Sequence, residues 1–160
     1  PMPQCRGPDM SDILRAVIAR NRAGLRAAIP SVCSAHPDVL AASLLLAQAL
    51  DRPVVIEATS NQVNQEGGYT GMTPERFIAF VQRLADETGT DRARIVFGGD
   101  HLGPQAWRRL PADQAMARAH VMVTDYVRAG FTAIHLDCSE GCAGEAAQLP
   151  DAVTVPRAAE

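Results

Sequence analysis

Polar residues gather at the ends of four short apolar runs, and their side chains are of types that carry out chemistry. These clusters occupy residues 31–36, 57–62, 98–101 and 135–139. They hold histidines, carboxylates and amides, which transfer protons, bind metal ions or grip hydroxyl groups. A βα barrel builds its site from polar residues at the carboxyl ends of successive strands. The pattern predicts chemistry on a small molecule, or a barrel descended from such an enzyme.

Asp100 and His101 form the sharpest local signal. They follow an apolar run and two glycines, Gly98 and Gly99. At the end of a strand, the pair would supply a proton-transfer group and a metal ligand on adjacent residues. The glycines would let a substrate approach the backbone closely. The alternative is a capping Asp beside a hydrogen-bonded loop His.

His135 and Asp137 lie two residues apart, so in a strand their side chains point the same way. One interpretation is a pair that binds a metal or a substrate, with His135 as metal ligand and Asp137 as substrate contact. The other is a buried His–Asp pair with a structural role. Ser139 could add a hydroxyl contact to a substrate.

Glu57 follows the apolar run 54–56 and needs a partner, because an unpaired carboxylate is costly to bury. A metal, an arginine or a substrate hydroxyl would satisfy it; an internal ion pair is the structural alternative. Asn61 and Gln62 carry amides suited to sugar hydroxyls. A polar loop without such a role is their other interpretation.

The elements that must position these residues alternate between strand and helix. Hydrophobic periodicity, with Ser, Thr and Pro at helix starts and Gly at helix ends, predicts helices over 11–23, 37–50, 73–88 and 111–129. Strands are expected over 27–33, 54–56, 94–97 and 132–136, and a short helix over 150–160. On the second helix, Val39, Leu40, Leu44 and Leu45 are expected to point inward.

Strands alternating with helices indicate an α/β fold with parallel pairing. Four βα units are half of a TIM (β/α)8 barrel, and a whole barrel takes about 200 residues or more. We therefore expect residues 11–160 to be the N-terminal half of a truncated barrel domain, after a loose segment 1–10. Such a half would expose sheet edges unless it were paired, which makes a homo-oligomer possible. A small open α/β sheet is the alternative.

Composition excludes some functions. The net charge of −3 argues against a nucleic-acid partner, and no apolar run is long enough for a membrane span. The four cysteines lack a disulfide or zinc-finger pattern, which favours reduced thiols and a cytoplasmic location. All fifteen basic residues are arginine, so this chain has no lysine for Schiff-base chemistry.

Several ordered motifs together resemble one family, the non-catalytic Z-type subunit of class II D-tagatose-1,6-bisphosphate aldolase. The motifs are 31–37 (SVCSAHP), 56–65 (IEATSNQVNQ), 67–74 (GGYTGMTP), 98–104 (GGDHLGP), 129–131 (AGF) and 134–137 (IHLD). The likeness runs from about residue 13 to 160. Members have also been labelled putative tagatose-6-phosphate kinase, but this chain shows neither a P-loop nor the lysine of a kinase.

The resemblance implies a TIM barrel related to zinc-dependent ketose-bisphosphate aldolases. In that superfamily a strand-end Asp-His supplies the catalytic acid and a zinc ligand, and Asp100 and His101 match those positions. It implies a protein that stabilises and activates a catalytic aldolase subunit in galactitol and N-acetylgalactosamine catabolism. A metal-dependent aldolase or epimerase acting on a ketohexose derivative, such as a sugar phosphate, is the alternative. The superfamily's other metal ligands come from the second half of the barrel, so the cofactor is expected to be zinc or another divalent ion only if that half is present.

Overall fold

A computed structural model describes residues 10–160, and the fold alternates helices with short strands. The elements are α1 (Met10–Arg22), β1 (Ser31–Cys33), α2 (Pro37–Ala49), β2 (Val54–Thr59), η1 (Gly68–Thr70), α3 (Pro74–Thr88), η2 (Arg92–Arg94), β3 (Ile95–Leu102), η3 (Pro104–Trp107), α4 (Ala112–Ala129), β4 (Ala133–Leu136) and α5 (Asp151–Ala159). Within residues 10–160, no helix has the length and apolarity to cross a bilayer. The predicted loose segment 1–10 lies, apart from Met10, outside the described residues.

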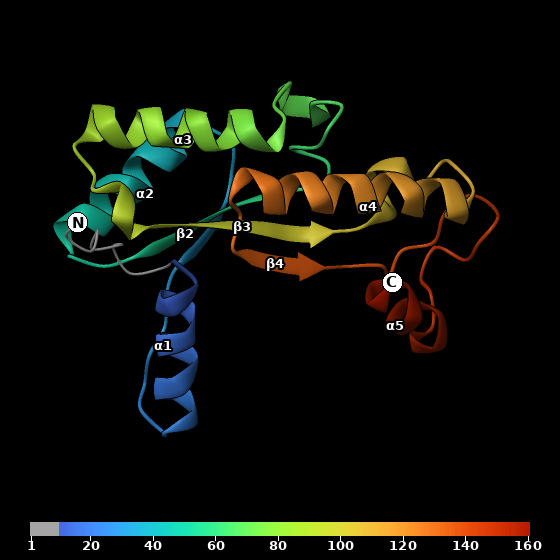
Figure 1. The fold of residues 1–160 in the computed structure, drawn as a ribbon, viewed down its shortest axis with the longest axis horizontal. Helices are drawn as coiled ribbons and strands as arrows, with labels where there is room; N and C mark the ends of the chain where they lie inside the picture. The colour runs from blue at the N-terminus through green and yellow to red at the C-terminus, as the bar shows by residue number, and fades with distance from the viewer. Residues whose placement is uncertain (1–9) are drawn as a thin grey trace, which may run out of the picture.

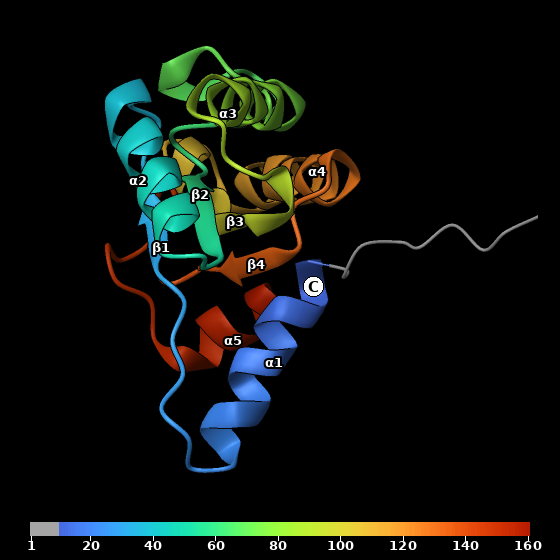
Figure 2. The ribbon, with the colours of Figure 1, turned by 90° about the vertical axis from the view of Figure 1, so that its left-hand side faces the viewer.

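The four strands form one parallel sheet in the order β1-β2-β3-β4. Helices α2, α3 and α4 cover one face, while α1 and α5 lie on the other (Figures 1 and 2). All strands point the same way because a helix returns the chain after each one. The predicted α/β class with parallel pairing is confirmed.

The core lies between the sheet and the layer of α2, α3 and α4. Alternate residues of β2 and β3 point into it, including Ile56, Ala58 and Phe97, and all three are buried. The helices contribute residues at helical spacing, such as Phe77, Val81 and Leu84 on α3. The other face of the sheet is buried mainly at Val55 and Val96, near the strand starts where α1 lies (Figure 1).

Helix ends follow the predicted chemistry in part. Gly89 and Gly130 end α3 and α4 in the left-handed conformation that glycine adopts easily. The expected helix starts hold in part. Thr73 is the N-cap residue of α3 with Pro74 directly after it, as predicted, but the Thr73 side chain makes no capping hydrogen bond. Helix α1 begins at Met10, so Ser11 lies inside it and the predicted cap there is wrong.

The inward face of α2 was predicted too broadly. Leu40, Leu44 and Ala47 form its buried stripe at the spacing i, i+4, i+7. Val39 and Leu45 flank that stripe and are 46% and 51% exposed, so their predicted burial is wrong. α2 carries apolar residues on several sides, so the sequence pattern did not indicate which side is buried.

The strand limits differ from the predicted ones in a way that matters for the polar clusters. β1 is only three residues long, whereas β2 extends to Thr59 and β3 to Leu102. Glu57 and Asp100 therefore lie inside strands, and ladder pairing fixes their backbones. Parallel pairing of β2 with β3 carries on through the polar residues, which composition alone did not indicate.

Tyr126 ties α4 to the end of β2. Its ring is fully buried, and its hydroxyl donates to the carbonyl oxygens of Ala58, Thr59 and Val63 at 3.4, 3.3 and 2.9 Å. The hydroxyl carries one hydrogen, so its main acceptor is the nearest of these oxygens, that of Val63. The contact fixes the path of the chain where it leaves β2.

Replacing Tyr126 by Phe should lower the free energy of unfolding by about 1–3 kcal/mol, because the carbonyl of the buried Val63 would lose this donor. Urea denaturation followed by circular dichroism measures this change. Tyr69→Phe is the matched control, since Tyr69 is 73% exposed and should tolerate the change. Equal stability of the two variants would contradict the anchoring role of Tyr126.

Candidate functional site

Strand alternation gathers the polar side chains on the face opposite α2, α3 and α4. Glu57 pairs with Gly98 and Thr59 with Asp100, so these positions share one face. The helix-facing positions between them, such as Ala58, are buried in the core. The carboxyl ends of β2, β3 and β4 therefore present their polar residues at one edge, as the sequence predicted.

His101 joins this face through a break in the alternation. In a regular strand, His101 would point away from Asp100, toward the helices. The β3–β4 register shifts between Gly99 and Leu102, and His101 has a φ of 51°. The bulge turns its imidazole to the face opposite α2, α3 and α4, which we call the open face. Leu102 takes the buried position instead.

Asp100, His101 and His135 form one cluster. Asp100 Oδ1 lies 2.8 Å from His101 Nδ1 and 3.1 Å from His135 Nδ1. The two imidazole rings meet edge to face with centroids 4.5 Å apart. The sequence suggested a pairing of His135 with Asp137; the structure pairs His135 with Asp100.

Contacts with both histidines affect the Asp100 carboxyl group. Burial raises the pKa of its carboxyl, but hydrogen bonds from His135, Cys33 and His101 outweigh that effect and hold the pKa below its usual value. A carboxylate can only accept hydrogen bonds, so each facing Nδ1 must carry the hydrogen. In a neutral imidazole, a hydrogen on Nδ1 leaves Nε2 with its lone pair, which is the form in which imidazole binds a metal.

The donor set fits a divalent transition metal. Asp100, His101 and His135 each offer one ligand atom, and these atoms lie within 4.8 Å of one another. Imidazole nitrogen with carboxylate oxygen suits zinc, iron or manganese. The side chains of His101 and His135 are about half exposed, at 52% and 56%, so they are accessible from the open face.

Cys33 belongs to the same neighbourhood, although the sequence gave it no role in chemistry. Its thiol ends β1 and contacts the Gln62 Oε1 at 3.6 Å. Partial burial and the neighbouring carboxylates of Asp100 and Glu57 raise the pKa of the thiol to about 12. Its position in the sequence could have indicated this, because Cys33 lies at the carboxyl end of the first strand, as Asp100 does on the third.

Glu57 has neither an ion pair nor a hydrogen bond to its carboxylate within residues 10–160, so the internal ion pair considered from sequence is not found there. Its side chain lies over Gly98, where an added Cβ would come within 2.6 Å of Glu57 Cγ. The predicted purpose of the two glycines is therefore wrong. Gly98 leaves room for Glu57 and Gly99 for Leu102, rather than for a substrate.

The two amides expected near a sugar separate in the structure. Asn61 is exposed and donates to Gln105 Oε1 at 3.2 Å. Gln62 is buried, and its Oε1 accepts from the backbone of Thr59 at 2.9 Å. Gln62 thus supports the loop after β2, and only Asn61 is free to meet a ligand from solvent.

Asp137 and Ser139 lie just beyond β4 and contact each other. Asp137 Oδ1 accepts a hydrogen bond from the Ser139 backbone at 2.8 Å. Partial burial raises the pKa of Asp137, while the bonds from Ser139 and the nearby histidines lower it more, so the pKa falls below its usual value. Both residues stand beside the cluster and shape the loop that follows β4.

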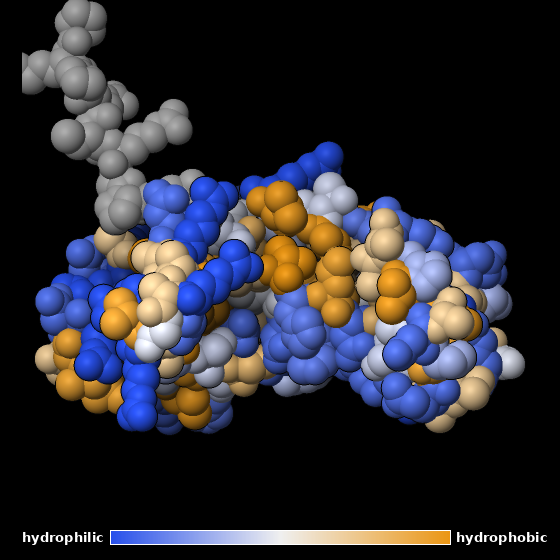
Figure 3. All heavy atoms as spheres, turned by 90° about the horizontal axis from the view of Figure 1, so that it is seen from below, coloured by the Kyte–Doolittle hydropathy of each residue, from blue (hydrophilic) through white to orange (hydrophobic). Residues whose placement is uncertain are grey.

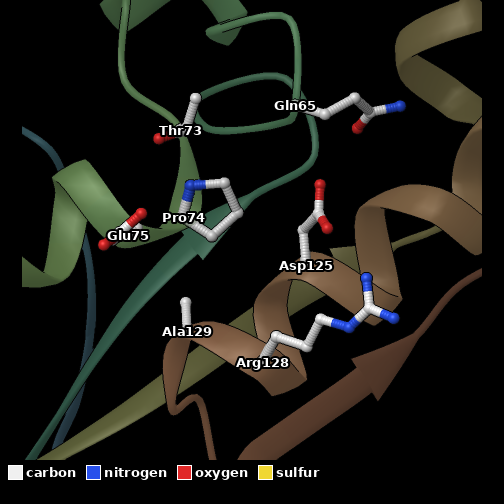
Figure 4. Close-up of a pocket in the computed structure, with 7 residues that line it drawn as sticks. All are labelled: Gln65, Thr73, Pro74, Glu75, Asp125, Arg128 and Ala129. Carbon is white, nitrogen blue, oxygen red and sulfur yellow. The ribbon is translucent and has the colours of Figure 1, made fainter.

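A hollow of about 520 Å³ lies elsewhere in the described part of the chain, between the start of α3 and the last turns of α4 (Figure 4). Gln65, Asp125 and Arg128 are among its lining residues, and none of the predicted site residues is. Among residues 10–160, the group of side chains that could hold a metal ion is Asp100, His101 and His135, at the open sheet face.

Comparison with known proteins identifies the relationship. The family model described as D-tagatose-1,6-bisphosphate aldolase subunit GatZ/KbaZ-like matches residues 14–160. The chain belongs to this family. The resemblance seen in the sequence motifs is therefore confirmed.

Individual relatives carry different names. The chain is 54% identical over 151 residues to a D-tagatose 6-phosphate 4-epimerase of Agrobacterium fabrum, covering 94% of this chain and 36% of the relative. It is 52% identical over 146 residues to the D-tagatose-1,6-bisphosphate aldolase subunit GatZ of Escherichia coli K12, covering 91% and 35%. The GatZ/KbaZ-like chain thus spans about a third of the length of these relatives.

A solved structure supports the fold. The crystal structure of a probable tagatose 6 phosphate kinase from Sinorhizobium meliloti 1021 aligns with a TM-score of 0.79 and 60% identity. The alignment covers 82% of this chain and 34% of that one. The arrangement of β1 to β4 and their helices is therefore shared with a larger protein.

Replacing His135 by Leu should raise the pKa of Asp100, because the chief hydrogen bond that lowers it would be lost. The lowered pKa of the folded state stabilises the native protein above about pH 4, and this stability is lost as the pH falls through the folded-state pKa. A ¹³C NMR titration of the Asp100 carboxyl measures the shift. His120→Leu is the control, and an unchanged Asp100 pKa in both variants would contradict the contact.

Proposed function

We propose that this chain is part of a subunit of D-tagatose-1,6-bisphosphate aldolase that stabilises and activates a separate catalytic chain in carbohydrate catabolism. The observation that carries the proposal is the family match over residues 14–160. The GatZ of E. coli is named as a subunit of that aldolase, which supports a partner chain. The catalytic subunit of a class II tagatose-bisphosphate aldolase is that partner.

The fold in this proposal is the first half of a TIM barrel. Strands β1 to β4 stand in the sheet in their sequence order, each followed by a helix or helical segment, which is how a barrel begins. Both edge strands, β1 and β4, have a single strand partner within residues 10–160. Further βα units would extend the sheet from these edges and enclose its open face.

A second candidate function is favoured by the Asp100–His101–His135 cluster. A purely structural subunit has no need for two histidines that share one carboxylate oxygen at a strand end. A metal-dependent epimerase or aldolase acting on a ketohexose phosphate does need such a group. The name of the A. fabrum relative, a D-tagatose 6-phosphate 4-epimerase, is consistent with this second candidate.

In the second candidate, each residue has a defined task. His101 and His135 hold the metal, as zinc or another divalent ion, and Asp100 orients their rings and transfers a proton at its Oδ1. Such an ion would polarise the ketose carbonyl as a Lewis acid. Glu57, which has no polar partner within residues 10–160, would accept hydrogen bonds from sugar hydroxyls, and Asn61 would donate to them. Asp137 and Ser139 would border the substrate from the β4 side.

Coexpression tests the subunit function. The complete gene that encodes this sequence is expressed with and without the catalytic aldolase chain of the same organism. We expect the two proteins to copurify, the half-life of aldolase activity at 37 °C to lengthen, and this chain to show no cleavage of tagatose-1,6-bisphosphate alone. Independent purification with unchanged half-life would contradict the subunit function, and cleavage by this chain alone would contradict its non-catalytic nature.

Cobalt binding tests the second candidate, because Co²⁺ is a visible probe for zinc-type sites. The full protein should bind about one Co²⁺, with absorption bands that disappear in His101→Ala and His135→Ala. His120→Ala is the matched control and should bind normally, since His120 lies on α4 outside the cluster. Absence of Co²⁺ binding by the unmodified protein would exclude the metal-dependent function, whereas binding without 4-epimerisation of tagatose 6-phosphate would exclude only the reaction.

A further inference from the structure

The conformation of His101 is unusual and must be held by its surroundings. Among residues 10–160, only Asp51 and His101 have positive φ without being glycine. A left-handed conformation costs an L-residue about 1–2 kcal/mol. Such strain persists only where neighbouring contacts leave no alternative. The contacts around the turn therefore decide where the imidazole points.

One contact comes from the β2 side of the turn. Ser60 follows β2 and is fully buried. Its Oγ donates to the carbonyl oxygen of His101 at 3.4 Å. This bond is long, and the Ser60 hydroxyl makes no other hydrogen bond within the described residues. It restrains the carbonyl group of His101, the residue with the unusual φ.

The stronger restraint comes from the β4 side. The backbone N–H of Asp137 donates to the Leu102 carbonyl at 2.8 Å, which joins the ends of β3 and β4 just after the bulge. Gly103 lies directly against this joint: an added Cβ would come within 1.8 Å of the Asp137 carbonyl oxygen and 2.9 Å of its carbon. A backbone group cannot rotate away as a side chain can, so any larger residue must push the two strand ends apart.

Backbone conformation does not explain the glycine. Gly103 has a φ of 178°, which is extended and open to any residue. The requirement at position 103 is therefore one of space between two strand ends. Two residues before Asp137 stands His135, and two before Gly103 stands His101, so the joint sets the separation of the two imidazoles.

We propose that Gly103 is a positioning residue, which holds His101 and His135 close enough to share Asp100 and to bind one metal ion, with Ser60 as a second anchor of the same turn. This inference rests on the proposed metal-binding function. It assigns the glycine after the Asp-His pair to the geometry of the site rather than to the conformation of the loop.

Gly103→Ala in the full protein tests the inference with two measurements. Without metal, the nuclear Overhauser contact between the ring protons of His101 and His135 should disappear. With metal, Co²⁺ affinity should fall at least about tenfold, the effect seen when supporting residues of metal ligands are lost. Gly89→Ala is the matched control: its positive φ makes alanine strained there, but it lies at the end of α3 with open space around it.

The possible outcomes distinguish the positioning role of Gly103 from the metal-binding function. A folded Gly103→Ala protein that keeps both the ring contact and the Co²⁺ affinity of the unmodified protein would overturn the inference. Loss of the ring contact in a protein that never binds Co²⁺ would support the positioning role and reject the metal. If Gly103→Ala gives no cooperative thermal transition, Ser60→Ala decides: about a threefold loss of affinity, the scale of one net hydrogen bond, is expected, and an unchanged affinity and ring contact would overturn the inference.

Discussion

The one-sided helical cover of the sheet is the constraint on which the site depends. Because α2, α3 and α4 bury one face, every second residue of β2 and β3 must be apolar, and Ile56, Ala58 and Phe97 meet that demand. The residues between them are free of it. Glu57, Thr59 and Asp100 can be polar only because they point to the face that these helices do not cover.

A shared acceptor then turns separate polar residues into a chemical group. Asp100 Oδ1 faces Nδ1 of both His101 and His135, and contacts with both histidines help to hold the pKa of Asp100 below its usual value. With Nδ1 of each ring turned to the same oxygen, Nε2 is the ring nitrogen that does not face Asp100. One carboxylate thus orients two side chains of a type that binds metal ions.

Regular patterns could be predicted from the sequence, and exceptions to them could not. The parallel α/β order, the glycine helix ends and the position of Asp100 and His135 at neighbouring strand ends all follow from periodicity and strand direction. The direction of His101 does not, since it depends on a bulge whose cause is the packing of Leu102. Gln62 and Cys33 were likewise misjudged, because the contact between them joins two different strand ends. The burial of Gln62 beside the exposed Asn61 leaves no mark on local composition.

The open face links the stability of the chain to its chemistry. Apolar side chains gather near the middle of this face (Figure 3), and the side chains of His101 and His135 are about half exposed. Exposed apolar surface favours a cover, whether further strands or another chain. That cover would also remove water from Asp100, His101 and His135, and electrostatic interactions strengthen as the local dielectric falls. The same cover would therefore bury the apolar surface and strengthen the interactions among Asp100, His101 and His135. A cover that buried only the apolar surface would have to leave the carboxyl ends of the strands exposed to water.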